Sequence, residues 1–325
     1  MLQNSTVQIE SLPCNLCNSH DISILATRSR SGAKLRTVIC NQCGLVWSDP
    51  FPHNPRHFYE KDYRIEYKST PTPKPNHILQ AGLVALARHS KIKHLLTDRK
   101  TILDVGTGGG EFAYLLKLSG HDQYGIEPNK GYAEYSIAEY NLNVQIGFIQ
   151  DSQFENNFFD IITIWHVLEH TENPYFVLLK LHSLLKPEGV LVVEVPNIEA
   201  TCQSPKSTFH EAHLFNFNLN TLSRMAEKAG FVTTSHLFSP DAGNITLFFQ
   251  KNPSNSTPTD TWTINDNAER ITSIVQGHTN LKHYLTITPY KRFLNRMIRR
   301  VSEKQGVKNF ENNKDLLNKL YQNYK

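Results

Sequence analysis

Two acidic residues and a glycine-rich turn form the most chemically specific pattern in this 325-residue chain. The apolar run TILDV ends at Val105, the glycines follow in GTGGG, and the helix-compatible run EFAYLLKL comes next. Glycine lets the backbone take positive φ and approach a ligand closely, and a helix N-terminus offers free N–H groups. Glu111 stands where a dinucleotide fingerprint has its last glycine, and Asp104 precedes the turn, so a positively charged ligand fits better than a pyrophosphate. Glu127 ends the next strand-like run, QYGIE, where a carboxylate can accept hydrogen bonds from two ribose hydroxyls.

This constellation resembles the class I S-adenosylmethionine-dependent methyltransferases. The resemblance implies that the first acid lies near the methionine part of the cofactor, that the glycines pass beneath it, and that the second acid holds the ribose. It also implies an adenine cradle after the third strand and an active-site edge at WHVLEH, after the fourth. The predicted cofactor contacts are Asp104, Gly106, Thr107, Gly108, Gly110, Glu127, Ile149, Trp165 and His166. A tight turn without a ligand is the alternative interpretation of the glycines alone.

Four cysteines form two CxxC pairs with the spacing of a metal site. Cys14 and Cys17 make the first pair, and Cys40 and Cys43 follow after twenty-two residues. Two such turns supply the four thiolates of a tetrahedral zinc site, and the strand-like runs between them are typical of a zinc ribbon. Four protein ligands leave no open coordination position, so we expect a structural Zn²⁺.

Three histidines are candidates for the base of the transfer step, because imidazole titrates near neutral pH. His213 is ranked first, His170 second and His210 third; the alternative is that they cap loops through hydrogen bonds. His170 closes WHVLEH, and the other two belong to HEAH, which precedes a helix and is expected to hang over the pocket. A metal site at His166 and His170 is less favoured than one packed and one pocket-lining histidine.

The elements that must position these residues alternate between strand and helix from Thr101 onward. The predicted strands are TILDVG, QYGIE, VQIGF, FDIITIW, GVLVVEV, FVTTSHLF and NITLFFQ; the predicted helices cover 77–96, 111–118, 130–140, 174–184 and 219–229. This alternation predicts a doubly wound α/β fold. The resemblance implies a seven-stranded Rossmann-like methyltransferase sheet whose last strand is antiparallel. The expected segments are a zinc ribbon (1–60), a connector and leading helix (61–98), the methyltransferase domain (99–250), and a linker with a basic helical tail (251–325).

The acceptor is constrained only by resemblance. The match over roughly 14–250 is similar to the zinc-ribbon subgroup that includes sugar C-methyltransferases, whose two active-site histidines correspond to His170 and His213. No counterpart of their further domain is expected in this chain, and its sequence departs from their Tyr-x-Glu-His set at His210 and Ala212. The expected acceptor is therefore a small molecule, with a sugar or nucleotide-linked sugar, at hydroxyl or carbon, as the first candidate.

Composition limits partners and compartment. No apolar run reaches the length of a membrane helix, and the paired cysteines favour a reducing compartment, so a cytoplasmic protein is expected. The last forty-five residues carry eleven Lys/Arg against three Asp/Glu, a surplus of about +8. ITPYKRFLNRMIRRV can form an amphipathic helix, which we expect to pack on the protein rather than on a membrane. RNA methylation and non-catalytic binding are the alternative functions; the first is disfavoured because the fourth-strand motif lacks an N/D-P-P-Y pattern.

Overall fold

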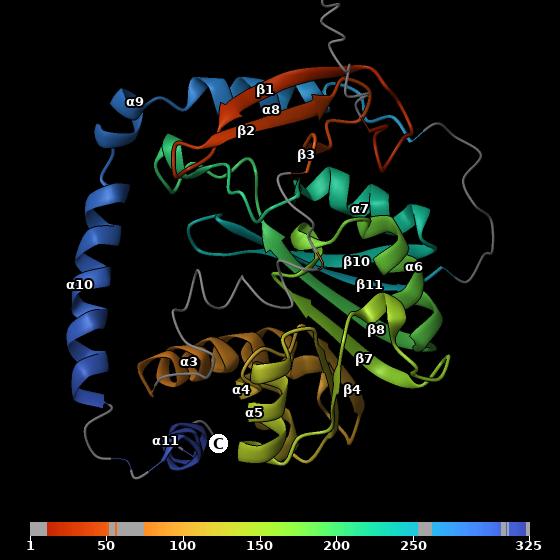
Figure 1. Cartoon of the computed structure of the whole chain (residues 1–325), viewed down its shortest axis with the longest axis vertical. Helices are drawn as coiled ribbons and strands as arrows, with labels where there is room; N and C mark the ends of the chain where they lie inside the picture. Colours follow the sequence, from red (N-terminus) through yellow and green to blue (C-terminus); the bar gives the residue numbers. More distant parts are fainter. Residues whose placement is uncertain are drawn as a thin grey trace, which may run out of the picture.

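A seven-stranded sheet occupies the centre of the computed structural model (Figure 1), which describes residues 12–51, 56, 75–252, 262–306, 310 and 312–322. Its strands follow the spatial order β10-β11-β8-β7-β4-β5-β6. The strands are β4 (Thr101–Val105), β5 (Asp122–Glu127), β6 (Val144–Ile146), β7 (Phe159–Trp165), β8 (Leu185–Pro196), β10 (Phe231–Phe238) and β11 (Asn244–Lys251). β11 runs antiparallel to both neighbours and the other pairs are parallel, which confirms the predicted sheet.

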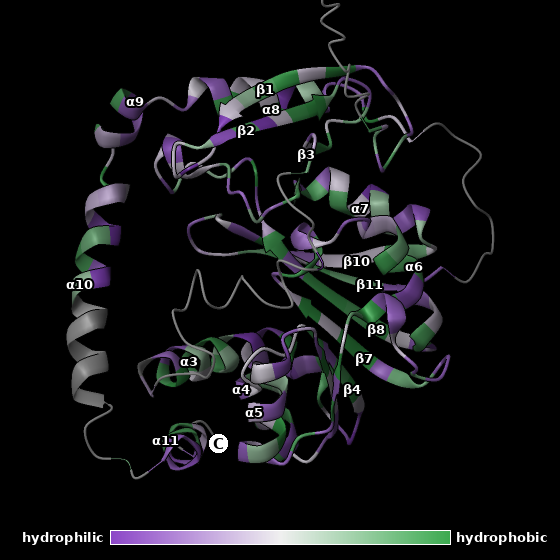
Figure 2. Ribbon diagram, in the orientation of Figure 1, coloured by the Kyte–Doolittle hydropathy of each residue, from purple (hydrophilic) through white to green (hydrophobic). Residues whose placement is uncertain are grey.

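Helices cover both faces of this sheet. On one face lie α3 (Pro75–Ile92), α4 (Glu111–Leu118) and α5 (Lys130–Tyr140); on the other lie α6 (Pro174–Leu184) and α7 (Leu219–Lys228). Ile161 and Trp165 of β7 pack toward the first group, whereas Ile162 and Ile164 pack toward the second. Because both faces are buried, the central strands are mostly apolar along their length, as Figure 2 shows for β7 and β8. Short 3-10 turns connect the elements: η2 (Lys93–Leu95), η3 (Ile149–Asp151), η4 (Leu168–His170) and η5 (Pro205–Ser207).

The cysteine-bearing segment forms a second, small sheet. It consists of β1 (Ile22–Arg28), β2 (Lys34–Cys40), β3 (Val46–Ser48) and β9 (Phe215–Asn216), paired antiparallel in that order. β9 belongs to the segment that follows β8, so the second sheet contains backbone from both parts of the chain. Lys228 of α7 adds a further link, donating to the carbonyl oxygens of Asn15 at 3.3 Å and Leu16 at 2.7 Å.

The C-terminal helices return to both parts of the protein. α8 (Asn267–Gly277) packs Ile271 into a core with the small sheet, and Asn267 Nδ2 donates to the Cys43 carbonyl at 2.8 Å. α9 (Asn280–Tyr284) and α10 (Thr288–Gly306) run along one side of the molecule to α11 (Asn313–Gln322), which packs on α3 (Figure 1). Residues 61–74 of the predicted connector and leading helix (61–98) lie outside the described residues.

α10 contacts α3, but the expectation that its apolar side packs on the protein is wrong for residues 290–297. Tyr290, Phe293, Leu294 and Met297 are 51–64% exposed, whereas Arg292 pairs with Asp241 at 2.5 Å. The helix therefore presents its apolar stripe to solvent. In the described part of the chain, no helix combines the length and hydropathy needed to cross a membrane.

Candidate active site

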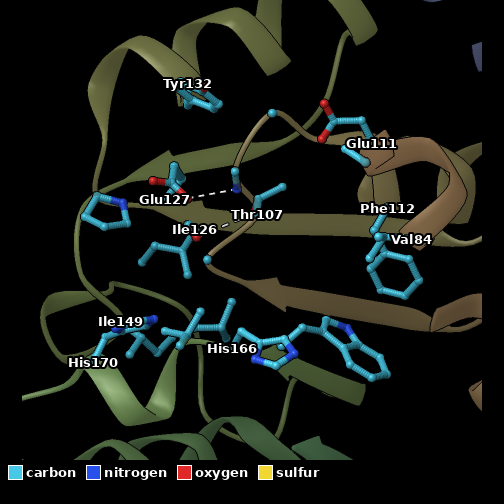
Figure 3. Close-up of a pocket in the computed structure, with 18 of the residues that line it drawn as sticks. Val84, Thr107, Glu111, Phe112, Ile126, Glu127, Tyr132, Ile149, His166 and His170 are labelled. Atoms are coloured by element: carbon cyan, nitrogen blue, oxygen red, sulfur yellow. Dashed lines mark hydrogen bonds between the residues drawn. The ribbon is translucent and has the colours of Figure 1, made fainter. Parts of the chain in front are cut away.

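A cavity of about 670 Å³ opens at the carboxyl ends of β4, β5 and β7, beneath α3 (Figure 3). Ligands of doubly wound sheets occupy this position, because the strand order reverses there. Seven of the nine predicted cofactor contacts line the cavity: Gly106, Thr107, Gly108, Glu127, Ile149, Trp165 and His166. Asp104 and Gly110 lie behind its wall.

The glycine turn has the backbone that its composition predicts. Gly106, Gly108 and Gly110 adopt φ values of +74°, +61° and +90°. A Cβ on Gly106 would collide with the Val167 side chain, and one on Gly110 would lie 2.7 Å from Leu142. Gly106 and Gly108 therefore form the cavity floor, while Gly110 is needed for packing at the start of α4.

Glu127 is held by two backbone donors at the tip of β5. Its Oε2 accepts from the Gly108 N–H at 2.8 Å (Figure 3), and its Oε1 accepts from the Asn129 N–H at 3.0 Å. Each carboxylate oxygen can accept more than one hydrogen bond. The carboxylate is thus fixed at the cavity wall and keeps acceptor sites for hydroxyl groups of a ligand.

Asp104 does not line the cavity; its carboxyl group is buried behind the cavity wall. It is 2% exposed, and its Oδ1 accepts from Thr163 Oγ1 at 2.9 Å. Burial raises the pKa of Asp104 to about 6, although Arg88 and Thr163 oppose the shift. The sequence interpretation anticipated the acid at this position but not its burial.

Arg88 of α3 is a cavity residue that the sequence analysis missed. Its guanidinium lies 5.4 Å from the ring centroid of Trp165, and the acids that act on its charge are Asp104, Glu194 and Glu111. Burial lowers the pKa of Arg88. The spacing of cavity residues along α3, at Ala81, Val84 and Arg88, is helical and could have indicated this side chain.

His166 links two buried carboxylates. It follows β7 with φ +55°, and its Nδ1 and Nε2 each lie 3.3 Å from an oxygen, of Glu169 and Glu194 respectively. Burial alone would lower the pKa of His166, but the two carboxylates outweigh it and raise the pKa to about 9. Glu194 also pairs with Lys91 of α3. The cavity edge therefore holds an alternating row of cationic and anionic groups.

The three predicted catalytic histidines lie together, but only His170 lines the cavity. The ring of His213 contacts that of His170 with 4.9 Å between centroids, and His210 stacks behind His213 at the same distance. Burial lowers the pKa of His213 well below its ordinary value and that of His210 to about 4. The HEAH loop therefore does not hang over the cavity in the way that the sequence predicted. It lies behind His170, which separates it from the cavity.

The four paired cysteines form a second cluster, in the small sheet. Their Sγ atoms lie within 4.8 Å of one another, with 3.4 Å between those of Cys14 and Cys43 and between those of Cys17 and Cys40. Gly44, directly after the last cysteine, has φ +78°, as a tight metal-binding turn requires. The donor set and its near-complete burial fit a tetrahedral Zn²⁺.

Comparison with known proteins agrees with this geometry. Residues 79–236 match the family model of a methyltransferase domain. A ubiquinone biosynthesis O-methyltransferase of Rickettsia canadensis is 32% identical over 100 residues, which are 30% of this chain and 42% of that protein. The same enzyme of Actinobacillus pleuropneumoniae is 31% identical over 108 residues, 30% of this chain and 46% of its own. The chain thus spans less than half the length of these two relatives.

Among solved structures, an S-adenosylmethionine-dependent methyltransferase of Thermotoga maritima aligns over 61% of this chain and 100% of its own, with 19% identity and a TM-score of 0.46. The residues that match the family model contain the glycine turn at the carboxyl end of β4 and the parallel strands β4, β5, β6, β7 and β8 of the sheet. The chain therefore contains a methyltransferase domain, which covers residues 79–236.

Proposed function

We propose that the protein transfers the methyl group of S-adenosylmethionine to a hydroxyl oxygen of a small molecule. The observation that carries this proposal is the cavity in which Glu127, the glycine turn and Arg88 meet. Glu127 would hold the ribose, and Ile126 and Ile149 offer apolar contact to adenine. Arg88 would pair with the carboxylate of the methionine part, and Asp104 supplies negative charge near the sulfonium.

When bound, the sulfonium supplies an electrophilic methyl group that a nucleophile displaces in line. The contribution of this chain is to orient both reactants and to exclude water, which can remove much of the barrier. Trp165 and the residues of α3 line one side of the cavity, and His170 is part of its wall. We infer that His170 meets the acceptor, with His213 and His210 supporting it from behind.

The acceptor is a small molecule in this proposal, and two observations bear on its type. The relatives are named as O-methyltransferases of ubiquinone biosynthesis, which favours an oxygen acceptor. The zinc-ribbon subgroup that the sequence resembles favours a sugar or nucleotide-linked sugar. We retain the sugar hydroxyl as the first candidate and a phenolic hydroxyl as the second.

Isothermal titration with S-adenosylmethionine tests the cofactor site. Glu127→Ala should weaken binding at least about tenfold, or 1.4 kcal/mol, because the ribose loses its acceptor. Glu134→Gln is the matched control, since Glu134 is exposed on α5 outside the cavity and pairs only with Lys130 among the contacts described. Equal affinity of the Ala variant and the wild type would show that the cofactor binds elsewhere.

Transfer of a labelled methyl group then tests the acceptor. Nucleotide sugars, catechols and other phenols, and RNA are offered in parallel to the wild type and to the Glu127→Ala variant. Label on a sugar or phenol that depends on Glu127 supports the proposal. Label that appears only on RNA would replace it with the alternative function.

A further inference from the structure

Glu169 is a buried acid whose surroundings are unusual. It is 1% exposed, and neither of its carboxylate oxygens has a hydrogen-bond partner in the described part of the chain. Nδ1 of His166 lies 3.3 Å from Oε1 of Glu169, and Nε2 of His170 lies 3.7 Å from the same oxygen. The ion pair with His166 offsets part of the cost of burying this carboxylate, and coordination of a metal ion would offset it further.

The orientation of His170 sharpens this observation. Its Nδ1 lies 2.7 Å from the carbonyl oxygen of Ala212, and a carbonyl can only accept, so Nδ1 carries the proton. In the neutral ring Nε2 then presents its lone pair to the Glu169 carboxylate. Two lone pairs that face each other require a cation between them. Donation of the other ring nitrogen to a backbone carbonyl is also how proteins orient a metal-bound histidine.

His213 completes a set of three ligands. One atom each of Glu169, His170 and His213 lie within 4.8 Å of one another. One carboxylate and two imidazoles form the protein ligand set of catalytic zinc sites, in which the remaining position is open to water or substrate. The same donors suit other divalent first-row ions. Because His170 lines the cavity, the open position would face the acceptor side of it.

We propose that Glu169, His170 and His213 bind a divalent metal ion at the edge of the cavity. This inference rests on the proposed function and refines the role of His170 there. An acceptor hydroxyl that coordinates the ion has a lowered pKa, so its proton passes to water and leaves an oxygen nucleophile. The ion is distinct from the Zn²⁺ expected at the four cysteines, which has no open position.

Manganese distinguishes the two metal sites. Mn²⁺ prefers oxygen and nitrogen ligands, whereas the four thiolates select softer ions. We therefore expect an electron paramagnetic resonance titration of the full-length protein, with zinc retained at the cysteines, to show one bound Mn²⁺. Glu169→Gln and His213→Ala should each weaken that binding at least about tenfold. His182→Gln is the control, because His182 is a half-buried histidine on α6 that packs on Phe231 outside the cavity.

Titration with S-adenosylmethionine in the same samples separates this proposal from the previous one. Retained cofactor binding with lost Mn²⁺ binding in either variant supports the metal site. The metal-site proposal is overturned if the wild-type protein binds the cofactor but no Mn²⁺, and if its only Zn²⁺ is the equivalent that is lost in Cys43→Ser. In that outcome a proton, and not a metal, lies between Glu169 and His170. Failure of the wild type to bind the cofactor would instead count against the proposed function.

A second inference concerns the exposed stripe on α9 and α10. Tyr290, Phe293, Leu294 and Met297 follow the i, i+3, i+4, i+7 spacing of a single helix face and point to solvent. The exposed apolar surface continues onto four residues that precede Tyr290, each with 54–78% of its surface exposed: Leu281, Tyr284, Leu285 and Ile287. Residues 280–297 contain four Lys/Arg and no acid, and Lys282, Lys291 and Arg296 are exposed.

We propose that this stripe docks on an anionic lipid surface. A basic helix with an exposed apolar and aromatic face has the properties of an interfacial membrane helix. Its Lys and Arg side chains favour acidic over uncharged headgroups near such a surface.

Vesicle flotation with the full-length protein tests the docking. Vesicles of phosphatidylcholine with phosphatidylserine should carry the protein, pure phosphatidylcholine should carry it much less, and the double variant Phe293→Ser/Leu294→Ser should abolish flotation. Ile24→Ser is the control, since Ile24 is 58% exposed on β1. Absence of flotation, or a dimer in solution that the double variant dissociates, would overturn the proposal; the dimer would identify the stripe as an interface between copies.

Discussion

At the scale of single residues, the cavity is surrounded by ionisable side chains that are buried from solvent. Asp104, Glu169 and Glu194 are buried, and His166 adopts a positive φ that non-glycine residues rarely take. Such strain persists where the surrounding structure imposes it, often at functional sites. Here it places one imidazole between two carboxylates. The buried acids and the strained backbone of His166 therefore lower the free energy of unfolding, while they keep in place the groups that ligand binding requires.

Asp104 allows this expense to be measured. Burial raises its pKa from 3.8 to about 6, so the ionised form is disfavoured in the folded state. This destabilisation is absent below pH 4, develops between pH 4 and 6, and is complete above, where it corresponds to about 3 kcal/mol at 1.36 kcal/mol per pKa unit. We expect Asp104→Asn to raise the free energy of unfolding of the ligand-free protein at pH 8 and to weaken binding of S-adenosylmethionine.

Urea unfolding at pH 8 and pH 4.5, with calorimetric titration, checks this prediction. The gain in stability should shrink toward pH 4.5, because the wild-type carboxyl is then mostly protonated. A variant that is less stable than the wild type at pH 8 would show that the Asp104 charge is structurally favourable.

At the scale of elements, α11 is part of the core although it lies outside the residues that match the family model. Leu316, Leu317 and Tyr321 are buried, Leu317 packs on Gly82 of α3, and the Tyr321 hydroxyl donates to the Glu111 carbonyl at 2.9 Å. α3 carries Arg88 on the side that faces the cavity. Because α11 packs on α3 as well, it supports the helix that covers the site.

Leu317→Ala tests this support. Removal of a fully buried leucine should lower the free energy of unfolding by about 2–5 kcal/mol. Leu294→Ala on α10 should change it little, because Leu294 is 57% exposed. Equal stability of the two variants in urea unfolding would mean that α11 does not pack on α3 in solution.

At the scale of the whole molecule, the cysteine-bearing sheet and the methyltransferase domain share elements. β9 pairs with β3, Ser48 N–H donates to the Leu214 carbonyl at 2.9 Å, and Asn267 of α8 binds the Cys43 carbonyl. The same segment, just before β9, carries His213. Metal at the cysteines is therefore expected to stabilise the loop behind the active site as well as the ribbon.

Cys43→Ser tests this coupling. The variant should lose about one equivalent of zinc and unfold at lower temperature in a single transition, because metal binding and folding are linked. Cys202→Ser should retain the metal, since Cys202 is a buried cysteine distant in sequence from the four ligands. A separate transition at the wild-type temperature would show that the ribbon and the domain fold independently.

Several features of this protein were predictable from the sequence because they depend on neighbours along the chain. The helices at 111–118, 130–140 and 174–184 have the predicted bounds, and all seven predicted strands are present. Asn129 and Asn173 accept hydrogen bonds at helix starts, and glycines take the positive φ that the turn after β4 needs. Periodicity, capping residues and glycines act over a few residues, so the chain itself encodes these elements. CxxC spacing is local in the same way.

Only the tertiary structure decided which side chains meet. Arg88 lines the cavity because of the way α3 packs on the sheet. Asp104 does not line it, because its position on β4 places the side chain in the interior. Glu169 and His213 are forty-four residues apart and meet because the Leu214 N–H, next to His213, donates to the Glu169 carbonyl at 2.8 Å. α10 turns its apolar stripe outward, whereas Arg292 on the same helix pairs with Asp241. These outcomes depend on the balance of packing and desolvation between distant segments, which local sequence patterns do not specify.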